Sequence, residues 1–168
     1  MKLNIRETAV FGFFGALMFA SKLVMEVLPN IHLLALFTLV FTVVYRGKAL
    51  YPIYIFVILC GLYGGFNLWW IPHLYLWLIL WGAVMLLPKN MPKWLAPVVY
   101  CAVCAAHGFL YGIMYAPAQA IMFGYNFNQT LAWIASGFPF DMIHGVSNLF
   151  CGMLAVPLIT VLRRLEKK

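Results

Sequence analysis

The positively charged residues of this chain are confined to short clusters, and the stretches between the clusters are almost free of charge. Each stretch has about 40 to 70 residues, which is enough for two membrane crossings of about 20 residues each. Two crossings return the chain to its starting side, so all clusters are expected on one side of a membrane. Ten of the 11 Lys and Arg residues form these clusters: Lys2 and Arg6; Arg46 and Lys48; Lys89 and Lys93; Arg163, Arg164, Lys167 and Lys168.

Water cannot be the solvent for most of the surface of such a chain. Of its 168 residues, 65% are hydrophobic and 9% are charged, and the mean hydropathy is +0.96. These values are typical of an integral membrane protein. Because the net charge of +7 is concentrated in the clusters, we expect it to set membrane orientation and not to bind nucleic acid.

We expect an all-α integral membrane protein, a bundle of six transmembrane helices in a single domain over residues 1–168. The second and fourth helices are short for a bilayer crossing. The expected spans are about 8–28, 31–45, 49–66, 72–87, 94–116 and 138–162.

The charge pattern also orients the chain. Both termini and the loops at 46–48 and 88–93 carry the cations, so they are expected in the cytoplasm. The remaining loops contain no Lys or Arg and are expected to face outward: 29–32, 66–73 and 117–130. The last of these is long enough to fold over a site as a lid, or to lie flat at the interface as an amphipathic segment.

Sequence signatures of enzyme chemistry are missing. Gly47 and Lys48 lack the preceding glycine and the following Ser or Thr of a phosphate-binding loop, so the chain is not expected to hydrolyse ATP. Cys101 and Cys104 form C-x-x-C in the fifth span, which fits a redox pair or two small buried side chains. We expect a protein that is not an enzyme and holds no cofactor or metal.

Two groups of polar residues fall within the expected spans. A charge at membrane depth costs at least about 2.5 to 3.5 kcal/mol, so such groups usually face a cavity, a partner or each other. Lys22 and Glu26 are four residues apart, and they either neutralise each other near the interface or anchor a polar substrate.

The second group opens the sixth span. Asp141, His144 and Asn148 lie three and four residues apart, on one face of a helix whose other residues are mostly apolar. With Pro139 in the first helical turn, Asp141 is expected in that turn, where the helix dipole favours a negative charge. The face is expected to line a binding pocket or to join an interhelical hydrogen-bond network.

Aromatic residues gather around the start of the fourth span. Trp69 and Trp70 suit an interfacial belt, whereas Trp81 falls near mid-membrane. Aromatic walls with few polar groups suit a flat heterocycle, and plain packing is the competing interpretation. The candidate substrate contacts in this segment are Asn67, Trp70, His73 and Trp77.

Small residues follow one face of the first span, at Ala9, Gly12, Ala16 and Ala20. Such a stripe allows another helix to approach closely. The partner is either a neighbour within this chain or a separate subunit.

The length, the six expected spans, this stripe, the opening "PFDMIHGVSN" and the ending "PLITVLRRLEKK" of the last span resemble the substrate-binding S component of energy-coupling factor (ECF) transporters. The resemblance implies high-affinity uptake of a vitamin, a vitamin precursor or another micronutrient across a prokaryotic cell membrane. It also implies a transmembrane coupling subunit and two cytoplasmic ATPase subunits as partners. The A-x-x-x-A docking motif of that family corresponds to Ala16 and Ala20, with Gly12 extending it.

The resemblance gives the polar residues a role. Asp141, His144 and Asn148 would form or brace the polar wall of a substrate pocket near the outer surface, and Lys22 and Glu26 would face them. The apolar wall would come from Trp69, Trp70, His73 and Trp77. Two other functions stay open: a proton-coupled carrier that acts alone, and a membrane thiol oxidoreductase that uses Cys101 and Cys104.

Overall fold

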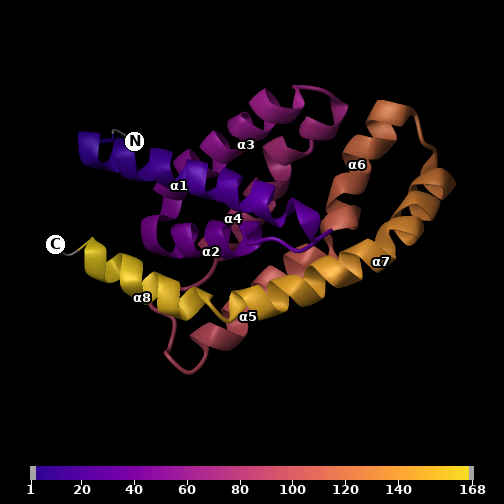
Figure 1. Ribbon diagram of the computed structural model, residues 1–168. Coiled ribbons are helices and arrows are strands. Elements are labelled where there is room, and N and C mark those ends of the chain that lie inside the picture. The colour runs from indigo at the N-terminus through magenta and orange to yellow at the C-terminus, as the bar shows by residue number, and fades with distance from the viewer. Residues whose placement is uncertain (1–2, 167–168) are drawn as a thin grey trace.

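The computed structural model describes residues 3–166 (Figure 1), and this part of the chain forms helices and no strand. Lys2, Lys167 and Lys168 of the cationic clusters lie outside the described residues. Between residues 3 and 166 there are three 3-10 turns, η1 (Met25–Val27), η2 (Arg46–Ala49) and η3 (Leu68–Trp70). The α-helices are α1 (Ile5–Val24), α2 (Leu34–Tyr45), α3 (Leu50–Gly64), α4 (His73–Met85), α5 (Ala96–Phe109), α6 (Tyr111–Phe123), α7 (Phe127–Gly152) and α8 (Ala155–Leu165).

Several helical segments are long and apolar enough to cross a membrane. α7 and α8 meet this criterion together, as a pair bent by 48°. Large apolar side chains such as Ile121, which is 83% exposed, lie on the outside, where lipid is a better solvent than water. The prediction of an all-helical membrane protein is confirmed, whereas the count of six spans stays a prediction. The four other segments that meet the criterion are Ile5–Val27, Leu34–Gly64, Leu68–Met85 and Ala96–Phe123.

Ring contacts show how α2 runs relative to α1. The ring of Phe11 packs edge-on against Tyr45, with centroids 5.1 Å apart. One turn further along α1, Phe14 stacks on Phe41 at 4.5 Å. As the residue numbers rise on α1 they fall on α2, so the two helices are antiparallel.

The chain turns back at η2, where Arg46 has a φ of 53°. Phe11 stacks on Tyr51 near the start of α3, and Phe19 contacts Tyr63 near its end. Residue numbers now rise together, so α3 runs parallel to α1. The continuous helical segment Leu34–Gly64 is therefore a helical hairpin made of two short arms.

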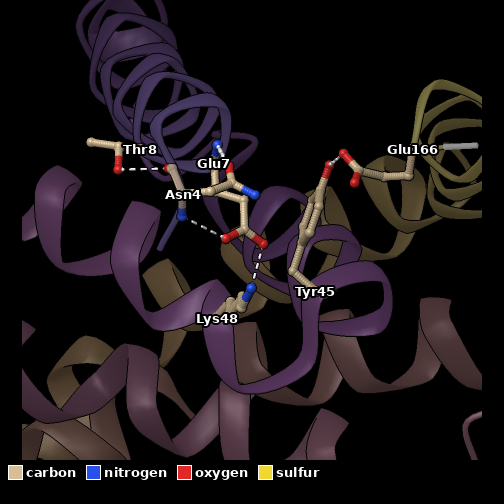
Figure 2. Close-up of polar contacts among 6 residues, drawn as sticks. All are labelled: Asn4, Glu7, Thr8, Tyr45, Lys48 and Glu166. Atoms are coloured by element: carbon tan, nitrogen blue, oxygen red, sulfur yellow. Dashed lines mark hydrogen bonds and ion pairs between the residues drawn. The ribbon is translucent and has the colours of Figure 1, made fainter. Parts of the chain in front are cut away.

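Three of the cationic segments meet at one end of the molecule, where Figure 1 also places both ends of the chain. Figure 2 shows Lys48 of η2 paired with Glu7 of α1, and the hydroxyl of Tyr45 donating to Glu166 Oε1 at 3.1 Å. The start of α1, η2 and the end of α8 are thus linked by side chains. This agrees with the prediction that they share one side of the membrane, while their cytoplasmic location stays a prediction.

The start of the sixth span was predicted wrongly. Instead of beginning near Pro139, α7 begins at Phe127, and Pro139 lies inside the helix. Asn126 caps this helix by accepting the backbone N–H of Gln129 at 2.9 Å, and the Gln129 side chain accepts the backbone N–H of Asn126 at 2.8 Å. This reciprocal capping box satisfies two N–H groups that would otherwise lack partners, and so fixes the start of the helix.

The predicted outward loop at 117–130 is wrong for the same reason. α6 continues to Phe123, and Gly124, with a φ of 67°, ends it in the left-handed conformation that glycine adopts easily. A tight connection then leads directly to α7. The segment is a helical hairpin, which extends to the right in Figure 1, and no long loop is present there to act as a lid.

Candidate functional site

The site is built where α5 and α7 cross at very short distance. A Cβ atom on Gly108 would lie 2.7 Å from both the Cα and the backbone nitrogen of Gly145. Further along, a Cβ on Gly152 would lie 2.9 Å from the Cα of Cys101. Side chains larger than hydrogen do not fit at these points, because small residues are what lets two helix backbones approach so closely.

Asp141 lies at the end of this seam and is 6% exposed. Its two carboxylate oxygens accept the backbone N–H of Gly112 at 3.1 and 3.0 Å. The predicted position in the first turn of its own helix is wrong, because α7 begins 14 residues earlier, at Phe127. Asp141 instead lies against the first turn of α6, where the positive end of that helix dipole favours a carboxylate.

Five aromatic side chains from five segments, including both helices of the seam, form a closed cycle of ring contacts. Going round the cycle, neighbouring ring centroids lie 4.5 to 6.3 Å apart. We call this group the aromatic cycle. Its members are His32 from the turn before α2, Trp77 from α4, His107 from α5, Tyr111 from α6 and His144 from α7.

Polar atoms of the aromatic cycle lack hydrogen-bond partners although they are buried. They are His32 Nδ1, Trp77 Nε1, His107 Nδ1 and His144 Nε2. Asn148, one turn beyond His144 on α7, is 0% exposed, and neither of its amide atoms has a partner. Buried polar atoms in native proteins are nearly always bonded to protein, water or ligand. Such a concentration of unpartnered atoms therefore marks a candidate binding site.

The charge state of the aromatic cycle follows from its burial. His32 lies in the turn between the first two candidate spanning segments. Burial, together with the nearby imidazoles of His144 and His107, lowers the pKa of His32 to about 3, so it is neutral at pH 7. No carboxylate bonds to any imidazole of the cycle in the part of the chain that the structure describes. The aromatic cycle is thus polar and contains no carboxylate, Lys or Arg, while the carboxylate of Asp141 lies at the end of the α5–α7 seam.

Lys22 and Glu26 lie outside the aromatic cycle but close to it. They form an ion pair at 3.3 Å, with side chains 28% and 58% exposed, so the pair is partly in contact with solvent or lipid headgroups. Both residues line a small surface pocket of about 170 Å³, and His32 lines the same pocket. His32 therefore belongs both to this pocket and to the aromatic cycle.

The other substrate contacts predicted near the start of α4 lie outside the aromatic cycle. The indole N–H of Trp70 donates to the carbonyl oxygen of Val57 at 2.8 Å. His73 Nδ1 lies 3.2 Å from the carbonyl oxygen of Trp69, and Asn67 is exposed. Of the four predicted contacts in this segment, Trp77 is the one that the structure brings into the aromatic cycle.

The small-residue stripe divides into two parts. At Ala9 it borders a pocket of about 520 Å³ that Leu162 and Leu165 of α8 also line, whereas its later residues face away from the rest of the chain. Ala16 and Ala20 are exposed, and a Cβ on Gly12 would meet no atom within 4 Å. The opposite side of α1 packs against the bundle, with Gly15 in contact with Ile55 of α3. Within residues 3–166, Gly12, Ala16 and Ala20 stay uncovered, which favours a separate subunit at these three positions, whereas a neighbour within the chain, α8, lies near Ala9.

The cysteines of α5 take part in the helix seam. Cys104 is 0% exposed, and Cys101 contacts Gly152 of α7. Both are free thiols. Among the described residues, no three His, Cys, Asp or Glu side chains are grouped in a way that can hold a metal ion.

Three members of the aromatic cycle were not predicted as site residues from the sequence. His107 and Tyr111 are four residues apart near the outer end of the expected fifth span, a spacing that places them on one helix face. His32 was assigned to a loop. A histidine within a membrane span is itself a signal, because ionisable groups there are costly and usually face a cavity or a partner.

Comparison of the chain with protein-family models, with curated proteins and with solved structures finds no match. The class of this protein therefore rests on its own residues and geometry: it is an all-helical membrane protein in which a buried aromatic cycle contains polar atoms without hydrogen-bond partners.

Proposed function

We propose that this chain is the substrate-specific, high-affinity binding subunit of an ATP-driven, ECF-type micronutrient transporter in a prokaryotic cell membrane. The observation that carries the proposal is the set of unpartnered buried atoms in the aromatic cycle and on Asn148. Leaving such atoms unpaired costs about 1–3 kcal/mol each, so a bound molecule that pairs with them gains that energy. A vitamin or a vitamin precursor is a substrate of suitable chemistry.

The outer face of α1, made of Gly12, Ala16 and Ala20, supports the second half of the proposal. It is made of small apolar residues and is uncovered, which suits close approach of a helix from another subunit. A transmembrane coupling subunit would dock there, and two cytoplasmic ATPases would supply energy. This arrangement explains why the chain itself has no phosphate-binding loop.

The proposal is tested by purifying the tagged chain in mild detergent from the membranes of its own cell. We expect it to co-purify with one membrane subunit and two ATPase chains, and the eluate to hydrolyse ATP. The matched measurement is uptake by proteoliposomes that contain the chain alone. Uptake at full rate without an ATPase would contradict the proposal and favour a solitary proton-coupled carrier.

A further inference from the structure

The hydrogen-bonding groups of the candidate site are of mixed type. Trp77 Nε1 can only donate, the amide of Asn148 offers donors and an acceptor, and each neutral imidazole has one nitrogen that donates and one that accepts. A molecule that satisfies all of them must itself carry both donors and acceptors. This requirement excludes ligands that carry only hydrogen-bond donors or only hydrogen-bond acceptors.

An anion is a poor match for this site. Lys and Arg are missing from the aromatic cycle, and the nearest cation on the adjoining pocket, Lys22, is already paired with Glu26. An anion would also leave the unpartnered acceptors without a donor. Burying it there without a counter-charge would carry a large desolvation cost.

A cation is also a poor match, although aromatic faces attract positive charge. An ammonium group only donates hydrogen bonds, so the donor Trp77 Nε1 would stay unpaired. Both oxygens of Asp141 accept the backbone N–H of Gly112, and Glu26, on the pocket that includes His32, is paired with Lys22. In the described part of the chain, neither carboxylate bonds to an imidazole of the aromatic cycle, so a bound cation would have to break an existing contact to gain a counter-ion.

We propose that the aromatic cycle and Asn148 bind an uncharged, flat ring molecule whose edge carries both hydrogen-bond donors and acceptors. Aromatic side chains of the cycle contact the face of the bound ring, while His32, His107, His144 and Asn148 form hydrogen bonds with the groups on its edge. A nitrogen heterocycle with an amino, oxo or amide group has this chemistry. The inference rests on the proposed function, because it names the class of substrate that the binding subunit takes.

The test compares probes that share one ring and differ in charge. The full-length protein in mild detergent is titrated by calorimetry with nicotinamide, nicotinate and 1-methylnicotinamide, which are neutral, anionic and cationic, and with the neutral rings cytosine and adenine. We expect at least one neutral ring to bind, and nicotinamide to bind at least about tenfold more tightly than its two charged analogues.

Two variants then locate the binding. Asn148→Leu and His144→Phe keep the approximate size of the side chains and remove their hydrogen bonds, so each is expected to weaken binding of the neutral ring at least about tenfold. Asn90→Leu, an exposed change in the loop between α4 and α5, is the matched control and should leave affinity unchanged. Where a variant does not fold, the comparison of probes on the unmodified protein still decides the ligand class.

Each other outcome overturns a defined part of the account. Tighter binding of nicotinate or of 1-methylnicotinamide would overturn the ligand class and leave the binding subunit in place. If no neutral probe binds, the inference fails; if no small molecule of any charge binds or co-purifies, the proposed function fails with it. If a neutral ring binds equally well to Asn148→Leu and His144→Phe, the site lies elsewhere.

Discussion

Gly108→Ala is expected to unfold at a clearly lower temperature than the unmodified protein. The added methyl group would lie 2.7 Å from backbone atoms of Gly145, which cannot move aside in the way that a side chain can. α5 and α7 must then separate, and overpacking of this kind costs about 1–3 kcal/mol of the free energy of unfolding. Because the aromatic cycle draws members from both helices, ligand binding should weaken as well.

The control for this experiment is Gly137→Ala in α7. A Cβ atom at Gly137 meets nothing within 4 Å, so the substitution changes helix propensity alone. Alanine is favoured over glycine in a helix by up to about 1 kcal/mol, and this variant should be as stable as the unmodified protein or more so. Equal melting temperatures for the two variants, measured in the same detergent, would show that the α5–α7 contact is not as close as described.

Ala16→Leu is expected to abolish ATP-coupled transport while substrate binding stays intact. Ala16 is exposed on the uncovered face of α1, so a larger side chain disturbs nothing within the chain. It would, however, hold a docking helix away, because close approach depends on small residues. The measurements are the ATPase activity that co-purifies with the variant and the affinity of the isolated variant for substrate.

Gly82→Leu on α4 is the matched control for bulk on an outer helix surface. A Cβ atom at Gly82 meets no atom within 4 Å, as at Gly12, but Gly82 lies outside the proposed docking face. The Gly82→Leu variant should therefore still co-purify with the ATPase subunits. Retention of full ATPase activity by Ala16→Leu would show that the coupling subunit docks elsewhere.

The sequence was most informative about which charged helix ends lie on the same side of the membrane. Clusters of cations can be located directly in the sequence. They mark the loops between apolar membrane crossings, and their charge indicates on which side of the membrane those loops lie. The prediction that the start of α1, the turn at Arg46 and the end of α8 share one side agrees with their contacts, through Tyr45 and Glu166 among others. The depth and number of the crossings need information that the charge pattern does not contain.

The start of α7 was missed because one local signal was given more weight than another. Pro139 suits the first turn of a helix, and so it was taken as the beginning of the span. Asn126 followed by Gln129 is a capping-box pattern in a polar segment, and the structure shows that this pattern sets the boundary. Proline inside a membrane helix is tolerated where neighbouring helices satisfy the freed carbonyl group.

The candidate site was only partly predictable. His144 and Asn148 share a helix face, and helical spacing alone was enough to group them. The remaining members of the aromatic cycle come from four other segments, and they meet because Gly108 and Gly145 let α5 and α7 pack closely. Such a contact depends on the shape of two helix surfaces at once, and no spacing within one segment encodes it.

The central claim is that the aromatic cycle holds a small molecule, and mass spectrometry tests it most directly. The protein is purified in mild detergent without added ligand and then denatured, and the released small molecules are identified and counted. We predict one uncharged ring molecule per chain, which is lost from His144→Phe and retained by Asn90→Leu. Release of no stoichiometric molecule, or equal release from both variants, would contradict the account and return the aromatic cycle to the role of packed core.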